Sequence, residues 1–309
     1  MKTLTAAILT MVISLSFLPQ HKAEAQSKLY DAAKLRKVDQ MIEKDIAAGF
    51  PGAVLVVVKD GRVIKKKAYG YSKKYDGNTL LSRPKKMKTS TMFDLASNTK
   101  MYAANFALQR LVSQGKLDVY QKVSAYLPDF KDRKSDPIQE KDRIRVIDVL
   151  QHQSGLPASF YFYQPDTAGP LYSQERDKTI RFLTQIPLEY KPGTKHVYSD
   201  IGYMLLGCII ENITGKTLDA YAEQELYKPL KLTHTLFNPL QKGFKEKAFA
   251  ATERLGNTRD GVIHFPHIRT YTLQGKFTMK KHFTPWEGCP VTPGCFPELM
   301  IWPSFFKSC

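Results

Sequence analysis

The segment from Ile201 to Ile213 constrains the fold more than any other part of the chain. It is apolar on nearly every side of a helix, so a helix formed here has no face that suits water. Such a helix has to lie inside a shell of other elements. Hydrophobic residues make up 43% of the 309 residues, which is enough to supply that shell. Helical patterns dominate from 97 to about 230.

The N-terminal part predicts a helix followed by a β-hairpin. Apolar residues recur at helical spacing over 32–48, and Gly49 ends the pattern. The run 53–58 is short and rich in valine, which favours a strand. A turn at 59–62 leads into a second strand that ends near Gly70. Helices and antiparallel strands are therefore expected in one chain.

Ser97 and Lys100 are the first candidate catalytic residues. They open an apolar helical pattern that runs to about Gln114 and stops at Gly115. If the helix begins at Ser97, the hydroxyl and the amine lie one turn apart on the same face. Serine becomes a useful nucleophile when a neighbouring base takes its proton. A lysine can act as that base when burial lowers its pKa and leaves the amine neutral. A helix-capping serine beside a surface lysine is the non-catalytic alternative. The residues expected on the buried face of this helix are Ala104, Ala107, Leu108, Leu111 and Val112.

Tyr198 is the second candidate, in the run Tyr198-Ser199-Asp200 that precedes the apolar helix. A tyrosine hydroxyl beside an ammonium group can accept or relay a proton. The alternative is a half-buried tyrosine whose hydroxyl makes an ordinary hydrogen bond.

The first 25 residues have the pattern of an export signal. A short basic start is followed by an apolar stretch, and Ala23-Glu24-Ala25 offers small residues for cleavage before Gln26. An uncleaved segment would instead tether the protein to the membrane. We therefore expect an exported protein, in the periplasm, with attachment to the inner membrane as the alternative.

Charge and cysteine content narrow the possible partners. The formal net charge is +17, but the basic residues are scattered, which indicates a solvated surface and no nucleic-acid partner. The cysteines have neither the spacing of a metal site nor that of a disulfide framework. Cys208 fits a small core residue, and the others lie in the last 21 residues: Cys289, Cys295 and Cys309.

Several of these motifs together resemble the family of serine β-lactamases and low-molecular-mass penicillin-binding proteins. Ser97-x-x-Lys100 matches the family's Ser-x-x-Lys, Tyr198 matches its Tyr-x-Asn, and the loop from His152 to Pro157 is similar to its His-Thr-Ser-Gly-Leu-Pro. The resemblance implies a mixed α/β (α+β) fold, with an antiparallel sheet flanked by helices and an all-helical half. It extends over about 29–275.

The resemblance also implies an activity. The runs 94–105, 198–200 and 255–266 look like those of D-alanyl-D-alanine carboxypeptidases of enteric bacteria. This implies a cofactor-free acyl-enzyme on Ser97, with Lys100 and Tyr198 moving protons and with peptidoglycan stem peptides and β-lactams as ligands. Asp200 replaces the family's Asn. A carboxylate can hold the Lys100 ammonium but offers no N–H donor, which weighs against efficient β-lactam hydrolysis. The alternatives are a β-lactamase or small-ester hydrolase, and a non-catalytic wall-binding protein.

The tail 276–309 departs from this pattern. It has no hydrophobic period. In the gene, a shifted reading frame that starts at the third base of codon 275 could encode a different tail. This alternative tail can contain a segment like the family's Gly-x-Ala-Gly-Leu-x-Ser. The hypothesis is therefore a one-base slip near Gly275, which the nucleotide sequence there would test. It predicts that the later sheet strands, with one of two oxyanion donors, are missing, and that this chain is poorly folded and essentially inactive.

Overall fold

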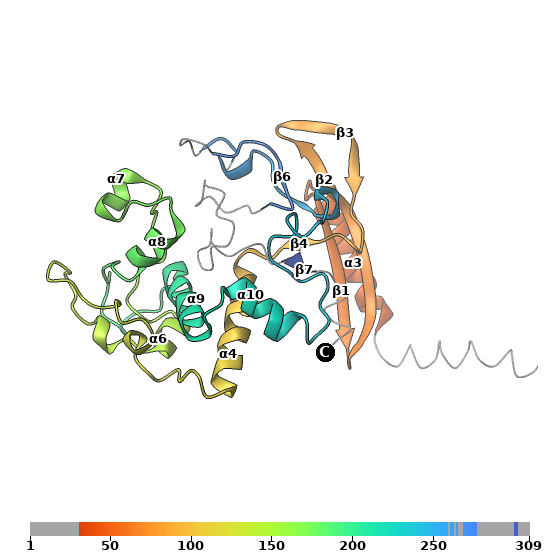
Figure 1. Cartoon of the computed structure of the whole chain (residues 1–309). Helices are drawn as coiled ribbons and strands as arrows, with labels where there is room; N and C mark the ends of the chain where they lie inside the picture. The colour runs from red at the N-terminus through yellow and green to blue at the C-terminus, as the bar shows by residue number, and fades with distance from the viewer. Residues whose placement is uncertain (1–30, 259, 263, 265–267, 277–299, 302–309) are drawn as a thin grey trace, which may run out of the picture. The chain divides into compact units, whose positions relative to one another are not determined.

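The computed structural model describes residues 31–258, 260–262, 264, 268–276 and 300–301 (Figure 1). Helices and antiparallel strands occur together, which confirms the mixed α/β class. The chain divides into two compact units. Among the described residues, 31–74 and 83–89 form one unit, which we call the sheet unit. The rest, 75–82 and 90 onward, form the helical unit.

The sheet unit is built on the predicted hairpin. Strand β1 (Gly52–Lys59) pairs antiparallel with β2 (Arg62–Asp76), with a bulge after Val57. Asp60 and Gly61 both have positive φ and form the two-residue turn between the strands. Gly70 also has positive φ, and a Cβ there would lie 2.5 Å from the carbonyl oxygen of Pro51. The hairpin is therefore confirmed, although β2 runs on to Asp76 and not only to its predicted end near Gly70.

A third strand, β3 (Thr79–Lys86), follows β2 and was not predicted from the sequence. Gly77-Asn78 between them is a hairpin-turn signal that could have revealed it. The strand order is β1-β2-β3.

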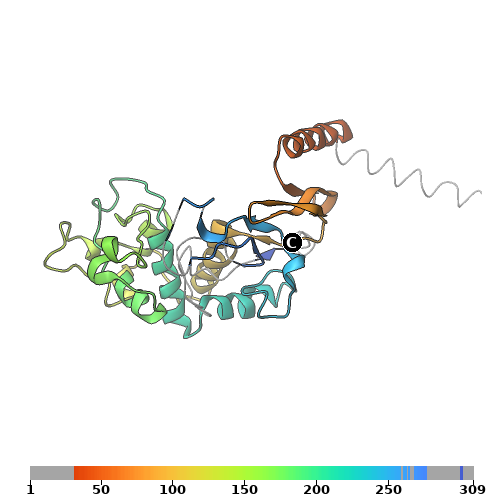
Figure 2. The same cartoon turned by 90° about the horizontal axis from the view of Figure 1, so that it is seen from above.

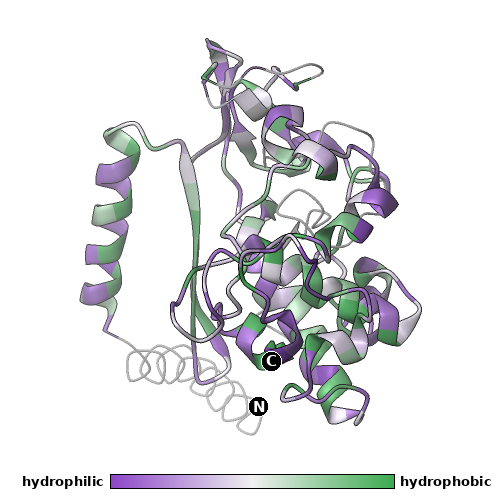
Figure 3. Ribbon diagram, turned by 90° about the vertical axis from the view of Figure 1, so that its left-hand side faces the viewer, coloured by the Kyte–Doolittle hydropathy of each residue, from purple (hydrophilic) through white to green (hydrophobic). Residues whose placement is uncertain are grey.

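Helix α3 (Ala32–Ala47) confirms the predicted N-terminal helix. Asp31 caps it by accepting hydrogen bonds from the backbone N–H groups of Ala33 and Lys34. None of its residues is buried, and Met41 is 67% exposed, although apolar residues recur at helical spacing along it. In Figure 3, hydrophilic and hydrophobic bands alternate along α3, whereas much of the strand that follows it is hydrophobic.

Polar contacts join α3 to strand β2. The Asp39 carboxylate lies 2.6 Å from the Lys65 amine and accepts a hydrogen bond from the Tyr69 hydroxyl. One turn further along the helix, Glu43 pairs with Lys67 at 2.9 Å. These side chains form what we call the polar seam of the sheet unit.

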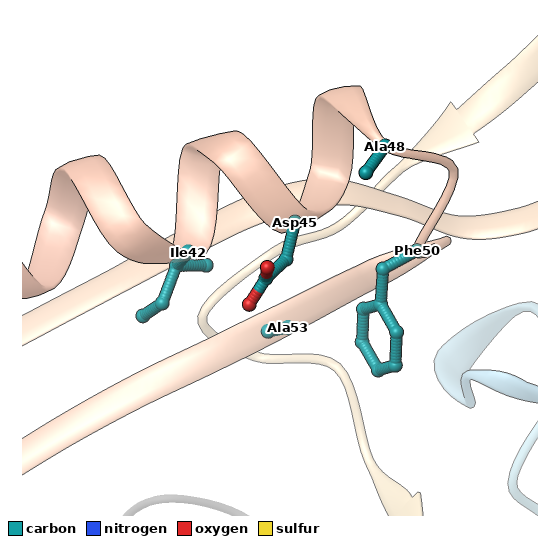
Figure 4. Close-up of a pocket in the computed structure, with 5 residues that line it drawn as sticks. All are labelled: Ile42, Asp45, Ala48, Phe50 and Ala53. Carbon is teal, nitrogen blue, oxygen red and sulfur yellow. The ribbon is translucent and has the colours of Figure 1, made fainter.

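A shallow hollow of about 370 Å³ lies between the end of α3 and strand β1 (Figure 4). Ile42, Asp45 and Ala48 line it from the helix side, and Phe50 and Ala53 line it from the strand side. Phe50 is 58% exposed. The hollow is thus a partly apolar surface at one end of the sheet unit.

The segment after Ser97 is helical, but it is not the single α-helix that the sequence predicts. It begins with a 3₁₀ turn (Ala96–Asn98), continues as a π-helical turn (Lys100–Asn105), and becomes α-helical as α4 (Phe106–Ser113). Gly115 ends it with positive φ, as predicted. Ala104, Ala107, Leu108 and Leu111 are buried as expected, but Val112 is 43% exposed.

Helix α9 (Asp200–Thr214) is the buried helix predicted at 201–213. Ten consecutive residues, Ile201 to Ile210, are buried, including Cys208. Ser199 caps its start and Gly215, in the left-handed conformation, ends it. The main hydrophobic cluster joins α9 to residues of α4, α6 (Val146–Leu150) and α8 (Arg176–Leu183), among others. These helices lie together in Figures 1 and 2.

Short elements complete the helical unit. The remaining helices are α5 (Val123–Tyr126), α7 (Pro165–Ala168) and α10 (Leu218–Ala222). A π-helical turn (Glu223–Tyr227) continues α10. Strand β4 (Phe93–Asp94) pairs with β7 (Met300–Ile301), and β5 (Ala251–Glu253) pairs with β6 (Leu273–Gln274). Single 3₁₀ turns span Lys141–Arg143, Gly169–Leu171, Glu246–Ala248 and Gly256–Thr258.

Several sequence predictions fall outside the described residues. These are the export signal, the cysteines at 289, 295 and 309, and most of the tail after 276. The frame-shift hypothesis and the missing strands therefore stay predictions. Within the described ranges, no helix combines the length and the apolar character needed to cross a membrane.

Candidate active site

Ser97 sits on a tight turn directly after strand β4. The Asp94 carboxylate accepts a hydrogen bond of 2.8 Å from the backbone N–H of Ala96. Ala96 has a φ of +45°, a region that an alanine adopts only at a cost in free energy. The side chain of Asp94 therefore helps to hold a strained backbone immediately before the candidate nucleophile.

The Lys100 amine lies between Ser97 and Asp200. Its Nζ atom is 3.3 Å from the Ser97 Oγ and 2.8 Å from the Asp200 Oδ1. Lys100 is 4% exposed, and the Asp200 side chain is also largely buried. A buried ammonium needs a compensating charge, and Asp200 supplies it. The structure thus brings together three of the four residues singled out in the sequence.

Tyr198, the fourth, presents its ring to the same amine. The Lys100 Nζ is 4.9 Å from the centre of the Tyr198 ring and 5.6 Å from that of Tyr203. These distances suit cation–π attraction. Tyr198 is 49% exposed, so part of this residue is open to solvent. Tyr203 is buried, and its hydroxyl donates to Asn105 at 3.1 Å.

The start of α9 fixes Asp200. The Ser199 Oγ accepts a hydrogen bond from the Gly202 N–H at 3.0 Å and donates one to the Pro157 carbonyl oxygen at 2.6 Å. Asp200 is the first residue of the helix, where the helix dipole favours a negative charge. The helix start therefore supports the carboxylate that pairs with Lys100.

His152 is the neighbour whose part in the site the sequence did not reveal, because it entered only as part of a family-like loop. Its ring lies 4.7 Å from the Tyr198 ring and 5.3 Å from the Tyr203 ring, centre to centre. Its Nδ1 accepts a hydrogen bond from the Ser199 backbone N–H at 3.0 Å. Burial, aided by the electrostatic effects of His196 and Lys100, lowers the pKa of His152. The ring is therefore neutral at neutral pH.

The arrangement has the parts that serine acyl transfer requires. A half-buried hydroxyl on a strained turn faces a buried amine, and a carboxylate and two aromatic rings surround that amine. The sequence model for the family described as Beta-lactamase matches residues 38–288. The chain belongs to the beta-lactamase family. The resemblance inferred from the Ser97 and Tyr198 motifs is thereby confirmed.

Named relatives of this beta-lactamase family chain include two bacterial proteins. A Bacillus subtilis (strain 168) protein named N-acetylmuramyl-L-alanine amidase is 68% identical over 96% of this chain. A Salmonella agona (strain SL483) protein with the provisional name D-alanyl-D-alanine carboxypeptidase is 52% identical over 87% of it. The chain spans 70% of the first relative's length and 62% of the second's.

Solved structures agree on the beta-lactamase-like fold. The octameric penicillin-binding protein homologue from Pyrococcus abyssi superposes with a TM-score of 0.62 at 20% identity. The match covers 90% of this chain and 55% of that one. At this identity the likeness concerns the fold alone.

Proposed function

We propose that this protein is a serine-type D-alanyl-D-alanine carboxypeptidase that acts on peptidoglycan stem peptides. The observation that carries the proposal is the position of the Ser97 hydroxyl, 3.3 Å from a buried lysine amine that is ion-paired with Asp200. The relative with the provisional carboxypeptidase name supports the choice of substrate. The proposed ligands are stem peptides ending in D-Ala-D-Ala, and the β-lactams that the family binds.

In the proposed reaction, the Ser97 Oγ attacks the carbonyl carbon of the penultimate D-Ala and Lys100 receives the hydroxyl proton. The Lys100 amine has a free electron pair only after its own proton has moved to Asp200 or to solvent. Tyr198, half exposed beside the amine, relays a proton to the leaving D-Ala nitrogen. The C–N bond breaks, terminal D-Ala departs, and water hydrolyses the ester on Ser97.

Asp200 favours peptide chemistry over β-lactam hydrolysis in this proposal. Its Oδ1 is engaged by Lys100 at 2.8 Å, and a carboxylate has no N–H to donate to a substrate carbonyl. Asp200→Asn restores such a donor. We expect this variant still to acylate and to turn over a cephalosporin faster than the parent.

A second candidate is the hydrolysis of a different peptidoglycan amide bond, because the relative at 68% identity is named N-acetylmuramyl-L-alanine amidase. The Ser97 Oγ, with Lys100 as the base, could attack either carbonyl carbon, so the two activities differ in which amide bond is presented to Ser97. A small-ester hydrolase uses the same acyl-enzyme. A non-catalytic wall-binding protein would bind peptide without forming one.

The test begins with a labelled penicillin and mass spectrometry of the adduct. We expect labelling at Ser97 and none in Ser97→Ala, while Ser113→Ala, an exposed serine at the end of α4, labels like the parent. The assays use this chain and a version carrying the shifted-frame residues after Gly275, which the sequence predicts to be the more active. Equal labelling of Ser97→Ala and the parent would remove the proposed nucleophile.

Product analysis then separates the candidates. Release of free D-Ala from a peptide ending in D-Ala-D-Ala supports the carboxypeptidase. Release of the intact stem peptide from muramic acid supports the amidase instead. Turnover of a cephalosporin or a short ester alone supports the other hydrolases, and peptide binding without any adduct supports the wall-binding protein.

Export is part of the proposal, because peptidoglycan lies outside the cytoplasm. The support is the N-terminal pattern ending at Ala23-Glu24-Ala25. Fractionation of cells that express the protein, with N-terminal sequencing of the product, tests export, cleavage before Gln26 and membrane attachment together.

A further inference from the structure

The loop after α6 is bonded along the segment that leads into α9. The Gln153 carbonyl oxygen accepts from the Gly193 N–H at 2.8 Å, and the His152 carbonyl oxygen accepts from the Val197 N–H at 2.9 Å. Further along, the Ala158 carbonyl oxygen accepts from the Asp200 N–H at 2.9 Å. These hydrogen bonds therefore hold in place the backbone segment that contains Tyr198 and Asp200.

One bond in this array involves a side chain that can titrate. The His152 Nδ1 accepts the Ser199 N–H, and Ser199 is 1% exposed, so no water replaces that acceptor at low cost. Ser199 stands between Tyr198 and Asp200 in the chain. His152 has a φ of +58°, a backbone conformation that is strained for a residue other than glycine.

We propose that His152 is a positioning residue for the chemistry of Ser97. Its neutral ring, protonated on Nε2, accepts the Ser199 N–H at Nδ1 and so holds Tyr198 and Asp200 at their distances from Lys100. The proposal rests on the proposed acyl transfer and adds a residue that acts on it without touching the substrate.

Protonation of His152 would undo this arrangement. A proton on Nδ1 would face the Ser199 N–H, so two donors would meet where one bond now exists. The groups facing the ring are Lys100 from the turn after Ser97, Asp200 and Tyr203 from α9, and His196 and Tyr198 from the segment before α9. Lys100 and His196 disfavour a positive charge on the His152 ring, whereas Asp200 favours it. Since burial and these two neighbours lower the pKa of His152, the neutral form persists below the usual histidine range.

Three substitutions of His152 distinguish the role of its hydrogen-bond acceptor from the role of the imidazole ring. His152→Asn places an oxygen where Nδ1 lies, and Asn tolerates positive φ. His152→Gln moves the acceptor outward to the place of Nε2, and His152→Ala removes it. We expect the Ala and Gln variants to acylate with penicillin about 10- to 100-fold more slowly. His152→Asn should recover most of that loss, and the loss should fall on the acylation rate more than on prior binding. His234→Asn, a histidine change outside the site, should match the parent.

The pH profile supplies a readout that a purely structural role would not give. The parent should lose acylation rate as the pH falls below the usual histidine pKa, whereas His152→Asn should lack that acid limb. Equal losses in the Asn and Ala variants, or an unchanged acid limb in His152→Asn, would overturn the acceptor role.

A measurement without any substrate keeps the inference separate from the proposed function. Nitrogen-15 NMR of the parent should find His152 protonated on Nε2 and bare on Nδ1 at neutral pH, with the Ser199 amide signal shifting as the ring titrates. A proton on Nδ1 at neutral pH would refute the proposal. If this tautomer is found but Ser97 is never acylated, the proposed function fails and the bond to Ser199 stands.

Discussion

Each of the two units of this chain is stabilised internally by a different kind of interaction. In the helical unit, α9 is buried along ten consecutive residues within the largest hydrophobic cluster that the described residues form. In the sheet unit, the described residues that are buried are Tyr69, Ser72 and Met87, and α3 has no buried residue. Instead, Asp39 and Glu43 hold α3 to the lysines of β2. One unit depends on apolar burial, and the other depends on the polar seam.

This difference bears on where the candidate active site lies. Ser97, Lys100, His152, Tyr198 and Asp200 all belong to the helical unit. Tight apolar packing holds side chains in single rotamers, whereas exposed charge pairs are weak and screened by salt. The site is therefore built where the packing can hold atoms at fixed distances.

The largest expected effect comes from opening a cavity in the helical unit. Leu205, on α9, is fully buried. Leu205→Ala should lower the free energy of unfolding by about 2–5 kcal/mol. The control is Val56→Ala on β1, a partly buried position, with an expected cost of roughly 1 kcal/mol. Denaturant titrations of both variants test the contrast, and equal losses would mean that the sheet unit depends on apolar burial as well.

An intermediate effect is expected from a buried carboxyl group on α9. Burial raises the pKa of Glu211 to about 7, against the opposing pull of Arg176 and of the Leu218 N–H that it accepts. Because the pKa is raised in the folded state, the protonated carboxyl group contributes to the stability of the fold. This contribution is fully present below the unfolded pKa of 4.5 and is lost as the pH rises toward 7. The change is at most about 1.4 kcal/mol per pH unit.

Glu211→Gln removes this titration while keeping an oxygen for the Leu218 N–H. Its stability relative to the parent should therefore rise between pH 4.5 and pH 7. Thermal unfolding across that range measures this rise, with Glu225→Gln in the π-helical turn after α10 as the matched control. A difference that stays flat with pH would show that the ion pair with Arg176 outweighs the cost of burial.

The smallest effect is expected in the polar seam. The hydrogen bonds from Lys65 and Tyr69 lower the pKa of Asp39, so its contribution is lost as the pH falls through that lowered value. Asp39→Asn should speed amide hydrogen exchange in α3 a few-fold and leave exchange in α9 unchanged. Added salt should do the same to the parent, because these pairs are partly exposed. Faster exchange in α9 under either change would mean that the two units are not held independently.

The sequence predicted the elements whose side chains follow a simple period. The pattern of 201–213 specifies α9 because an all-apolar helix has only one stable environment, the interior. The valine run and the Asp60-Gly61 turn specify the first hairpin in the same local way. Ser97 and Lys100 were recognisable as candidates because their spacing of three positions predicts neighbouring side chains on one face of a helix.

Other features depend on contacts that no local pattern contains. The π-helical turn at Lys100–Asn105 and the exposure of Val112 depend on how the start of this segment meets its neighbours. The bond from Ser199 to His152 joins residues 47 positions apart. A lone histidine in a loop gives no sign of which backbone group it will accept. Tyr203 was visible only as one more apolar position of α9.

The backbone at Ala96 sets a limit on how this protein could be improved. Glycine adopts a φ of +45° freely, so Ala96→Gly would relieve backbone strain at the turn. The more flexible backbone would also increase the mobility of the Ser97 hydroxyl. A laboratory selection for heat resistance alone would accept such a change, and a selection for turnover would reject it. Ala96 is thus a position where robustness and catalytic rate are expected to trade against each other.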